Sequence, residues 1–422
     1  MLSILSRWNR WGTARLPAGI VRDATQKIYP VVNTPEIVVL IGMRRSGKTT
    51  ILFQVMDYLE SQKIPQEAML HINFEEPALA SALSLDALDQ IYHEYREKIF
   101  PTGKAYLFFD EIQNVPQWER WVRARNESEN IKIFLTGSSA NLMSRELGTV
   151  LTGRHVSFHI HPLNFSEFLK FKKISVPKNT VIEPPHEIYH AVENYLLWGG
   201  LPEIVLSQSN ERRELLLKQY FDDLLFKDVA MRHEIRDIAL LRNLAVYLMT
   251  QTASLVSYNR IANQFGISIE KSRSYCACLQ EAFLVEYLPF FSLKTAERNR
   301  HPFKVHAVDL GLRNVVALSC SEDKGRLIET AVCHHLKTKY QTDLYYWKSE
   351  QEIDFLRYQK NEVVELVQVV LRGDSEMTLH RELSALSSAK KCFPKASESI
   401  VLGKLPKNPN KLMVALWRFL LS

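Results

Sequence analysis

The sequence predicts an α/β fold with a largely parallel sheet in its first half, then a helical region and a mixed α/β segment. Short apolar runs alternate with helix-forming stretches up to about Phe168, a pattern typical of parallel sheets covered by helices. Helical patterns fill the middle of the chain, and strand-like runs return after about Val305. The strands expected in the first half are Glu36–Ile41, Ala68–Phe74, Lys104–Phe109 and Ile131–Leu135.

Composition narrows the class of protein. The 422 residues, 46% of them hydrophobic and 24% charged, suffice for two or three domains with buried cores. A net charge of +6 permits nucleic acid as a partner without requiring it. No apolar run approaches the about 20 residues of a membrane-spanning helix, so we expect no membrane segment. Five cysteines without a CxxC pair indicate reduced thiols and a cytoplasmic protein.

The most specific motif directly follows the first expected strand. Residues 42–49 match the pattern GxxxxGK[ST] at every fixed position, and Thr50 follows. Its glycines let backbone N–H groups face a phosphate, and the next helix adds a favourable dipole. Lys48 should reach the β- and γ-phosphates of ATP, and Thr49 should bind Mg²⁺. The predicted nucleotide-binding residues of this loop are Gly42, Arg44, Arg45, Ser46, Gly47, Lys48, Thr49 and Thr50.

A second apolar run ends in two carboxylates, Asp110 and Glu111. A strand that emerges beside the phosphate-binding loop would bring Asp110 to Mg²⁺, and Glu111 could then orient or deprotonate the attacking water. Two solvated acids at a strand end are the ordinary alternative. Their position downstream of a phosphate-binding loop favours the catalytic interpretation.

The fourth expected strand leads into two adjacent serines, Ser138 and Ser139. A hydroxyl at this place can sense the γ-phosphate, and we favour Ser138. Arg154 and Arg145 are candidates for an arginine that neutralises charge during phosphoryl transfer. Either could instead form a surface ion pair, and for Arg145 that alternative is preferred.

The middle of the chain contains a helix-turn-helix pattern. It begins near Leu255, with Ser257 as the cap of the first helix and Gly266 at the turn. The second helix could contact DNA, but packing against another protein segment is the favoured alternative. The residues that would meet DNA are Lys271, Arg273 and Tyr275.

Six motifs, in this order, resemble those of prokaryotic AAA-superfamily (AAA+ or STAND-like) P-loop ATPases that carry a winged helix and a nuclease-like domain of unknown function. The resemblance covers nearly the whole chain. It implies that Gly200 and Pro202 contact the nucleotide and couple it to the next domain; a helix-capping glycine and a helix-stopping proline are the alternative. The six motifs are Arg44–Thr50, His71–Glu76, Phe108–Gln113, Leu135–Ser139, Leu151–Arg154 and His161–Phe168.

The resemblance also implies a nuclease frame of the PD-(D/E)xK kind in the last segment, with Glu329 and Asp354 as acids. Gln368 and Val370 stand where this frame has its second acid and its lysine. A neutral amide is a poor ligand for Mg²⁺, and strand alternation should point Glu365 to the opposite face. We therefore expect a nuclease-like fold without nuclease activity.

These motifs predict an ATP-driven, Mg²⁺-dependent conformational switch coupled to DNA or to a protein partner. The alternatives are a DNA-binding module and an ATP-regulated metal-dependent nuclease, and the oligomeric state stays open. The expected segments are an N-terminal arm at 1–34, packed on the ATPase core rather than serving as a targeting peptide, the core at 35–169, a helical region at 186–252, a winged-helix-like segment at 253–300 and a nuclease-like domain at 301–422.

Overall fold

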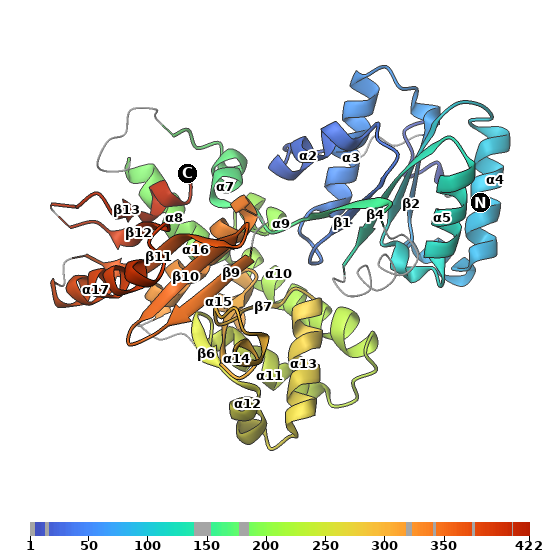
Figure 1. Cartoon of the computed structure of the whole chain (residues 1–422). Coiled ribbons are helices and arrows are strands. Elements are labelled where there is room, and N and C mark those ends of the chain that lie inside the picture. Colours follow the sequence, from blue (N-terminus) through green and yellow to red (C-terminus); the bar gives the residue numbers. More distant parts are fainter. Residues whose placement is uncertain are drawn as a thin grey trace. The chain divides into compact units, whose positions relative to one another are not determined.

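The computed structural model of the protein describes residues 5–12, 17–138, 153–176, 185–317, 323–340, 343–373, 376–406 and 408–422. Two compact units, Met1–His161 and Pro162–Ser422, make up the chain. Figure 1 shows the elements of each unit. Among the described residues, no helix is both long and apolar enough to cross a membrane.

Unit 1 is built on a five-stranded sheet in which all neighbouring strands are parallel. The strand order is β2-β3-β4-β1-β5, and β1, β3 and β4 are buried along their whole length. A sheet covered on both faces requires such apolar strands. The strands are β1 (Ile37–Ile41), β2 (Met69–Asn73), β3 (Ala105–Asp110), β4 (Ile131–Gly137) and β5 (His155–His159).

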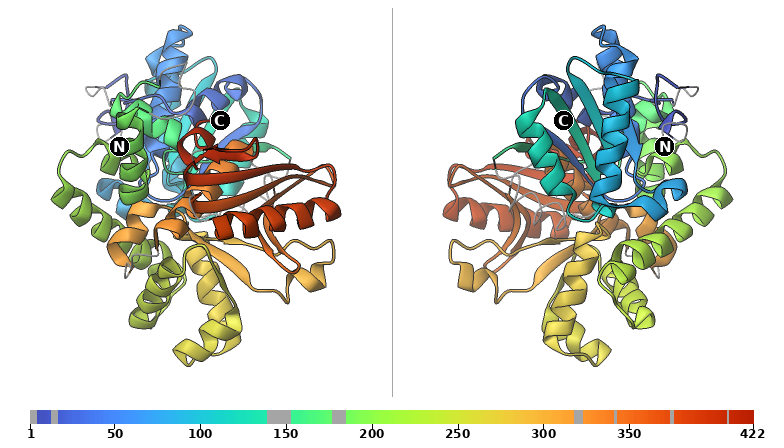
Figure 2. Two further views of the ribbon diagram at one scale, coloured as in Figure 1. Left: turned by 90° about the vertical axis from the view of Figure 1, so that its left-hand side faces the viewer. Right: turned by 90° about the vertical axis from the view of Figure 1, so that its right-hand side faces the viewer.

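Helices cover both faces of this sheet (Figures 1 and 2). On one face lie α2 (Asp23–Ile28) and α3 (Lys48–Ser61), whose core includes Ile51, Val55 and Phe108. On the other face lie α4 (Leu85–Lys98) and α5 (Trp118–Ser128). Short 3-10 turns occupy Tyr29–Val31, Gln66–Ala68, Pro77–Ala82 and Ile112–Asn114.

The strand order decides what meets at the edge of the sheet. Because β4 lies between β1 and β3, the carboxyl ends of these three parallel strands lie side by side. Ligands of open α/β sheets bind at such an edge. The loop after β1, the acids after β3 and the hydroxyls at the end of β4 are therefore brought together.

The described part of the N-terminal arm contacts the edge strand β2. The side chain of Asn9 is completely buried; its Nδ2 donates to His71 O (2.8 Å) and its Oδ1 accepts from His71 N (2.6 Å). Trp11 Nε1 donates to Met69 O (3.1 Å). An edge strand presents unpaired backbone groups, and here side chains of the arm satisfy them.

Unit 2 begins with helices. The sequence pattern predicts one long helical region after Glu211, whereas the structure places a turn at residues 232–237 between two helical stretches. Asp237 caps the helix that follows the turn, because its side chain accepts from Leu240 N (3.0 Å). The helices are α7 (Phe165–Lys172), α8 (His186–Trp198), α9 (Pro202–Leu206), α10 (Asn210–Asp223), a π-helix (Leu224–Met231) and α11 (Ile238–Thr250).

A small antiparallel sheet follows, in the order β6-β8-β7. Along the chain, two helices lie between β6 and β7. Each is capped by a serine, and Gly266 (φ 62°) lies at the turn between them. The strand β8 lies beyond the predicted boundary at residue 300 and pairs with both other strands. The elements are β6 (Ser254–Val256), α12 (Tyr258–Phe265), α13 (Ile269–Glu281), β7 (Val285–Leu288), α14 (Thr295–Arg298) and β8 (Phe303–Ala307).

The chain ends in a mixed sheet with the order β13-β12-β11-β10-β9. Pairing is antiparallel from β9 to β11 and parallel from β11 to β13, as the sequence pattern predicts for a mixed α/β segment. Figure 2 shows α17 lying along this sheet. The elements are α15 (Leu310–Val316), α16 (Asp323–Tyr340), β9 (Asp343–Lys348), β10 (Glu352–Gln359), β11 (Glu362–Arg372), α17 (Glu376–Cys392), β12 (Ser397–Lys404), β13 (Met413–Ala415) and α18 (Leu416–Phe419).

Candidate nucleotide site

The loop after β1 needs glycine at two positions. A Cβ atom on Gly42 would lie 2.2 Å from Ile160 O, which is too close for two atoms that are not bonded. The oxygen belongs to the backbone and cannot move aside as a flexible side chain could. Gly47 has φ 97° and directly precedes α3, in a conformation that glycine adopts without strain. The two fixed glycines of the sequence motif are therefore required by the local backbone.

Lys48 and Ser46 point inward within this loop. Lys48 Nζ donates to Gly42 O (2.9 Å) and Met43 O (3.2 Å), and its side chain is 4% exposed. Ser46 is fully buried, and its Oγ has no hydrogen-bond partner among the described residues. A buried hydroxyl without a partner is costly, and a phosphate oxygen is the kind of acceptor that would satisfy it.

The loop is also held from outside by an arginine that sequence reasoning missed. Arg22 Nη1 donates to Ser46 O (2.8 Å), and its Nη2 donates to His161 O (2.9 Å). The side chain is almost fully buried. Arg22 thus ties the phosphate-binding loop to the segment that follows β5.

The two predicted metal ligands are in direct contact. Thr49 Oγ1, at the start of α3, donates to Asp110 Oδ2 at the end of β3 (2.6 Å). Thr136 on β4 completes the group: its Oγ1 donates to Asp110 Oδ1 (2.5 Å) and accepts from Glu111 N (2.9 Å). Thr136 is a second residue that the sequence pattern did not predict, although a hydroxyl at the end of an apolar strand is a signal for it.

Glu111 is held in position by the backbone hydrogen bond to Thr136 and by two contacts of its side chain. Its backbone is left-handed (φ 53°), its Oε1 lies 3.3 Å from Lys48 Nζ, and its Oε2 accepts from Gln113 Nε2 (2.5 Å). Gln113 Nε2 also lies 3.4 Å from Ser138 Oγ. Gln113 therefore bridges the expected catalytic acid and the expected sensor residue.

The two acids differ in electrostatics. Burial raises the pKa of Asp110 to about 6, and the neighbouring charge of Glu111 acts in the same direction. Burial also opposes the ionisation of Glu111, but the ammonium of Lys48 and the amide of Gln113 outweigh it and lower the pKa of Glu111 to about 2. At neutral pH Glu111 is thus a charged carboxylate paired with Lys48. A cation bound beside the neighbouring Asp110 would favour the ionised form of that acid.

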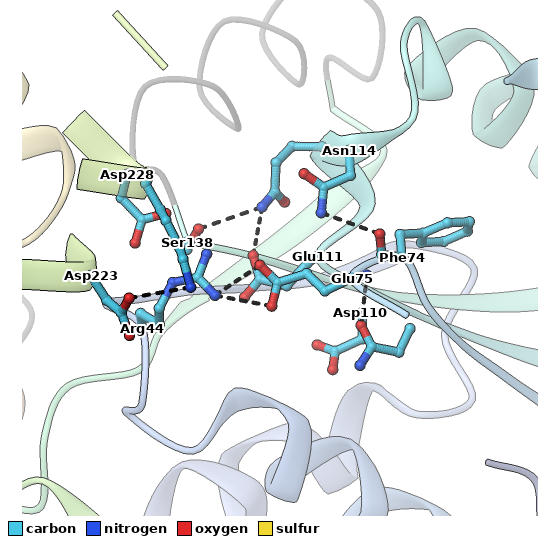
Figure 3. A network of polar contacts seen from close by, with 12 residues as sticks. Arg44, Phe74, Glu75, Asp110, Glu111, Asn114, Ser138, Asp223 and Asp228 are labelled. Carbon is cyan, nitrogen blue, oxygen red and sulfur yellow. Dashed lines mark hydrogen bonds and ion pairs between the residues drawn. The ribbon is translucent and has the colours of Figure 1, made fainter. Parts of the chain in front are cut away.

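The other residues predicted for the nucleotide site differ in their surroundings. Arg44 Nη1 lies 2.8 Å from Glu75 Oε1 (Figure 3), and Arg45 has φ 68°. Arg154, whose side chain is 45% exposed, forms an ion pair with Glu127 on α5. Thr50 is in the first turn of α3. Ser139 and Arg145 lie outside the described residues.

Gly200 and Pro202 belong to unit 2. Gly200 N donates to Asp309 Oδ2 (2.8 Å), and Gly200 O accepts from Leu163 N (2.7 Å). Gly199 caps the end of α8 with φ 71°, and Pro202 starts α9 instead of stopping a helix. Gly200 is therefore not the residue that caps the helix, and Pro202 does not stop one, as the alternative interpretation assumed. The contact of Gly200 and Pro202 with a nucleotide stays a prediction.

In the helix-turn-helix segment, the structure corrects one expected DNA contact. Tyr275 is buried, at 7% exposure, and therefore cannot reach a base or a phosphate. Arg273 is exposed, and its guanidinium lies 5.1 Å from the ring centroid of Tyr258. Lys271 is partly exposed.

The nuclease-like acids occupy unit 2. Asp354 and Gln368 are adjacent, since Asp354 N donates to Gln368 Oε1 (3.2 Å). Val370 lies in the apolar core of the sheet, and Glu365 instead pairs with Arg357 (2.9 Å). Within the part of the chain that the structure describes, no group of three or more His, Cys, Asp or Glu side chains is arranged to hold a metal ion.

Comparisons with known proteins identify the type of domain that contains this site. Residues 34–169 match the model of an AAA domain, and residues 189–323 match a domain of unknown function (DUF8612). Unit 1 thus contains an ATPase domain of the AAA class, which is consistent with nucleotide binding and hydrolysis.

Two relatives extend over most of the chain. An uncharacterised protein of Methanocaldococcus jannaschii is 34% identical over 88% of this chain and 81% of its own length. An uncharacterised protein of Haemophilus influenzae is 30% identical over 80% of this chain and 84% of its own length. The chain belongs to the family of these two proteins.

Solved structures show a weaker likeness. The Aeropyrum pernix ORC2 protein in its ADP form has a TM-score of 0.37 and 12% identity, covering 72% of this chain and 95% of that one. A TM-score of this size supports no inference about function.

Proposed function

We propose that the chain binds ATP with Mg²⁺ at the loop of residues 42–50 and hydrolyses it as a conformational switch acting on its C-terminal half. The observation that carries this proposal is the hydrogen-bonded group formed by Thr49, Asp110 and Thr136 beside the Lys48–Glu111 pair. Each side chain needed to hold a phosphate, a hard cation and a water molecule is present there within one site.

In this proposal, Lys48 and the N–H groups of the loop bind the phosphates, and Ser46 Oγ donates to one of their oxygens. Thr49 and Asp110 would hold Mg²⁺, which neutralises charge on the phosphates when it is bound. Ser138 senses the γ-phosphate through Gln113, and Arg154 could supply charge only after leaving Glu127. Action of Arg154 on a neighbouring copy would require an oligomer.

The Lys48–Glu111 pair suggests why hydrolysis would be slow and dependent on substrate. A carboxylate with a pKa of about 2 is a poor base at neutral pH. A bound phosphate would draw Lys48 away from Glu111, which would raise the pKa of this acid. Glu111 would then orient or deprotonate water only when ATP is in place.

Steady-state ATPase activity with Mg²⁺ tests the proposal. We expect Lys48→Ala to abolish ATP binding, and Glu111→Gln to retain ATP while losing turnover. The matched controls are Lys98→Ala and Glu97→Gln on the exposed side of α4, which should behave as wild type. Unchanged turnover in both site variants would contradict the proposal.

A second candidate function is DNA binding by α12 and α13, coupled to the ATPase. It is favoured by the capped helix pair and the adjoining strands β6, β7 and β8, an arrangement that fits a winged helix, and by the exposed arginines Arg260 and Arg273. A protein partner for this surface is the competing interpretation. Phosphate contacts would make DNA binding fall steeply with salt.

Binding of duplex DNA at increasing salt concentrations distinguishes the two interpretations. The double variant Arg260→Ala with Arg273→Ala should weaken binding and reduce the salt dependence, whereas the exposed Arg236→Ala should not. Binding that is absent, or insensitive to salt, would remove DNA as the partner.

A further inference from the structure

Three carboxylates converge on one ammonium group in unit 2. Lys304 Nζ lies 2.9 Å from Glu329 Oε1, 2.8 Å from Glu352 Oε1 and 2.8 Å from Asp354 Oδ1. The lysine comes from β8 of the small sheet, Glu329 comes from α16, and the other two acids come from β10. The lysine side chain is 3% exposed. The cluster therefore joins the small sheet to the helix and strand of the last segment.

The hydrogen-bonding groups at the centre of this cluster are already used. An ammonium has three N–H donors, and Lys304 faces three carboxylates. The second oxygen of Asp354 accepts from Val369 N (2.9 Å). The neighbouring Gln368 donates to Glu382 Oε2 (2.6 Å), so its amide is also engaged. Little capacity is left for a further ligand.

A second paired lysine in unit 2, whose side chain is 24% exposed, provides a comparison. Lys337 on α16 forms an ion pair with one carboxylate, Glu286 on β7. A single carboxylate is thus enough to pair a partly buried ammonium in this unit, whereas Lys304, at 3% exposure, faces three. Oxygens from several acids around one point are instead typical of a divalent cation.

The charges support the same interpretation. Burial alone would lower the pKa of Lys304, but the carboxylates of Asp354, Glu329 and Glu352 raise it well above its usual value. Burial raises the pKa of Glu329 to about 8, against the effect of Lys304. Lys304 therefore keeps its charge, and the cluster can reduce its excess of negative charge by holding a proton on Glu329.

From this geometry we infer that Lys304 is a built-in cation that takes the place of a divalent metal ion among Glu329, Glu352 and Asp354. The site needs no metal to balance its acids, and wild-type protein binds none there. The cluster instead holds β8 against α16 and β10. This inference concerns unit 2 alone and does not depend on ATP hydrolysis.

The test replaces Lys304 by methionine, which keeps an unbranched chain and removes the charge. Manganese is added to the nucleotide-free full-length chain, and bound Mn²⁺ is counted by electron paramagnetic resonance while unfolding is followed by heating. We expect Lys304→Met to melt at a lower temperature than wild type. It should bind one Mn²⁺ more than wild type, and its melting temperature should rise with the logarithm of the Mn²⁺ concentration.

Two controls place the effect at this cluster. Adding Asp354→Asn to Lys304→Met should abolish the extra Mn²⁺. Lys337→Met also loses a paired ammonium, here a partly buried one, but leaves only one carboxylate, so it should gain no Mn²⁺. If Lys304→Met does not fold, the triple variant with Glu329→Gln and Asp354→Asn should fold without metal, because two of the three acids are neutralised and only Glu352 keeps its charge.

Three results would overturn the inference. The first is a Mn²⁺ ion bound to wild-type protein and lost in Asp354→Asn. The second is a folded Lys304→Met protein that gains no Mn²⁺. The third is an unfolded triple variant, because the defect of Lys304→Met would then not arise from unbalanced acids.

Discussion

At the scale of single residues, the nucleotide site depends on a hydroxyl that belongs to neither the loop nor the acid pair. Thr136 bonds to the carboxylate of Asp110 and to the backbone N–H of Glu111. Because all three residues are buried, neither partner can turn to water instead. The threonine thereby fixes the orientation of the Asp110 carboxylate and the position of the Glu111 backbone.

Replacing Thr136 by valine keeps the shape of the side chain and removes both hydrogen bonds. We expect kcat for ATP to fall by about 10- to 100-fold, the usual range for residues that orient a metal ligand. Affinity for ATP should change little because the loop is intact, and Thr136→Ser should stay near wild type. Steady-state kinetics with a separate nucleotide-binding titration measures both quantities, and a normal kcat in the valine variant would contradict this role.

At the scale of elements, the arm of residues 5–12 protects the edge of the sheet. Asn9 satisfies both backbone groups of His71 on β2, as a neighbouring strand would do. The edge would otherwise be open to pairing with another chain. Stability of the ATPase domain therefore depends on residues that precede its first strand.

Asn9→Ala should lower the free energy of unfolding by about 2 kcal/mol, because two buried backbone groups lose their partners. Asn130→Ala, at an exposed position before β4, is the matched control and should have little effect. Urea unfolding of the full chain measures the difference. Equal stability of the two variants would mean that water or another group replaces Asn9.

His71 on β2 makes the stability of unit 1 depend on pH. Burial lowers its pKa to about 4, against the weaker effect of the backbone of Trp8. The unfolded chain, where the pKa is about 6.5, then binds more protons than the folded chain as pH falls from about 6.5 to 4. This histidine should therefore cost unit 1 up to about 3 kcal/mol of stability over that range.

His71→Leu should lack this component of the pH dependence. Urea unfolding of wild type and variant at several pH values gives the comparison, since the other titrating groups are shared. The stability difference should move in favour of the variant as pH falls. A difference that stays constant with pH would show that His71 accepts its proton in the folded chain.

At the scale of the whole molecule, the proposed switch requires that nucleotide bound in unit 1 alters unit 2. With ATP and Mg²⁺, the Glu111→Gln variant should change the hydrogen exchange of the α8–α11 helices, because it holds ATP without turnover. Lys48→Ala should show no change under the same conditions. A change confined to unit 1 would leave nucleotide binding intact and contradict the switch.

Much of unit 1 could be predicted from local patterns. Apolar runs predicted strands where β1 to β4 lie, and the glycines of the loop are explained by the backbone they must adopt. The edge strand β5 was not predicted as a separate strand, because its sequence is half polar and its residues are only partly buried. Arg22 and Thr136 were missed because their roles arise from contacts between distant segments.

Sequence alone determined the AAA-type loop, the acid pair that follows it, and the alternation that makes the first half a parallel sheet. These features are local, because glycine conformations, apolar periodicity and strand-end carboxylates depend on neighbouring residues. Only the tertiary structure decided that β4 lies between β1 and β3, which brings Thr136 to the acids. It alone placed Lys304 among three carboxylates from α16 and β10, since burial of a charge is settled by which distant groups fold around it.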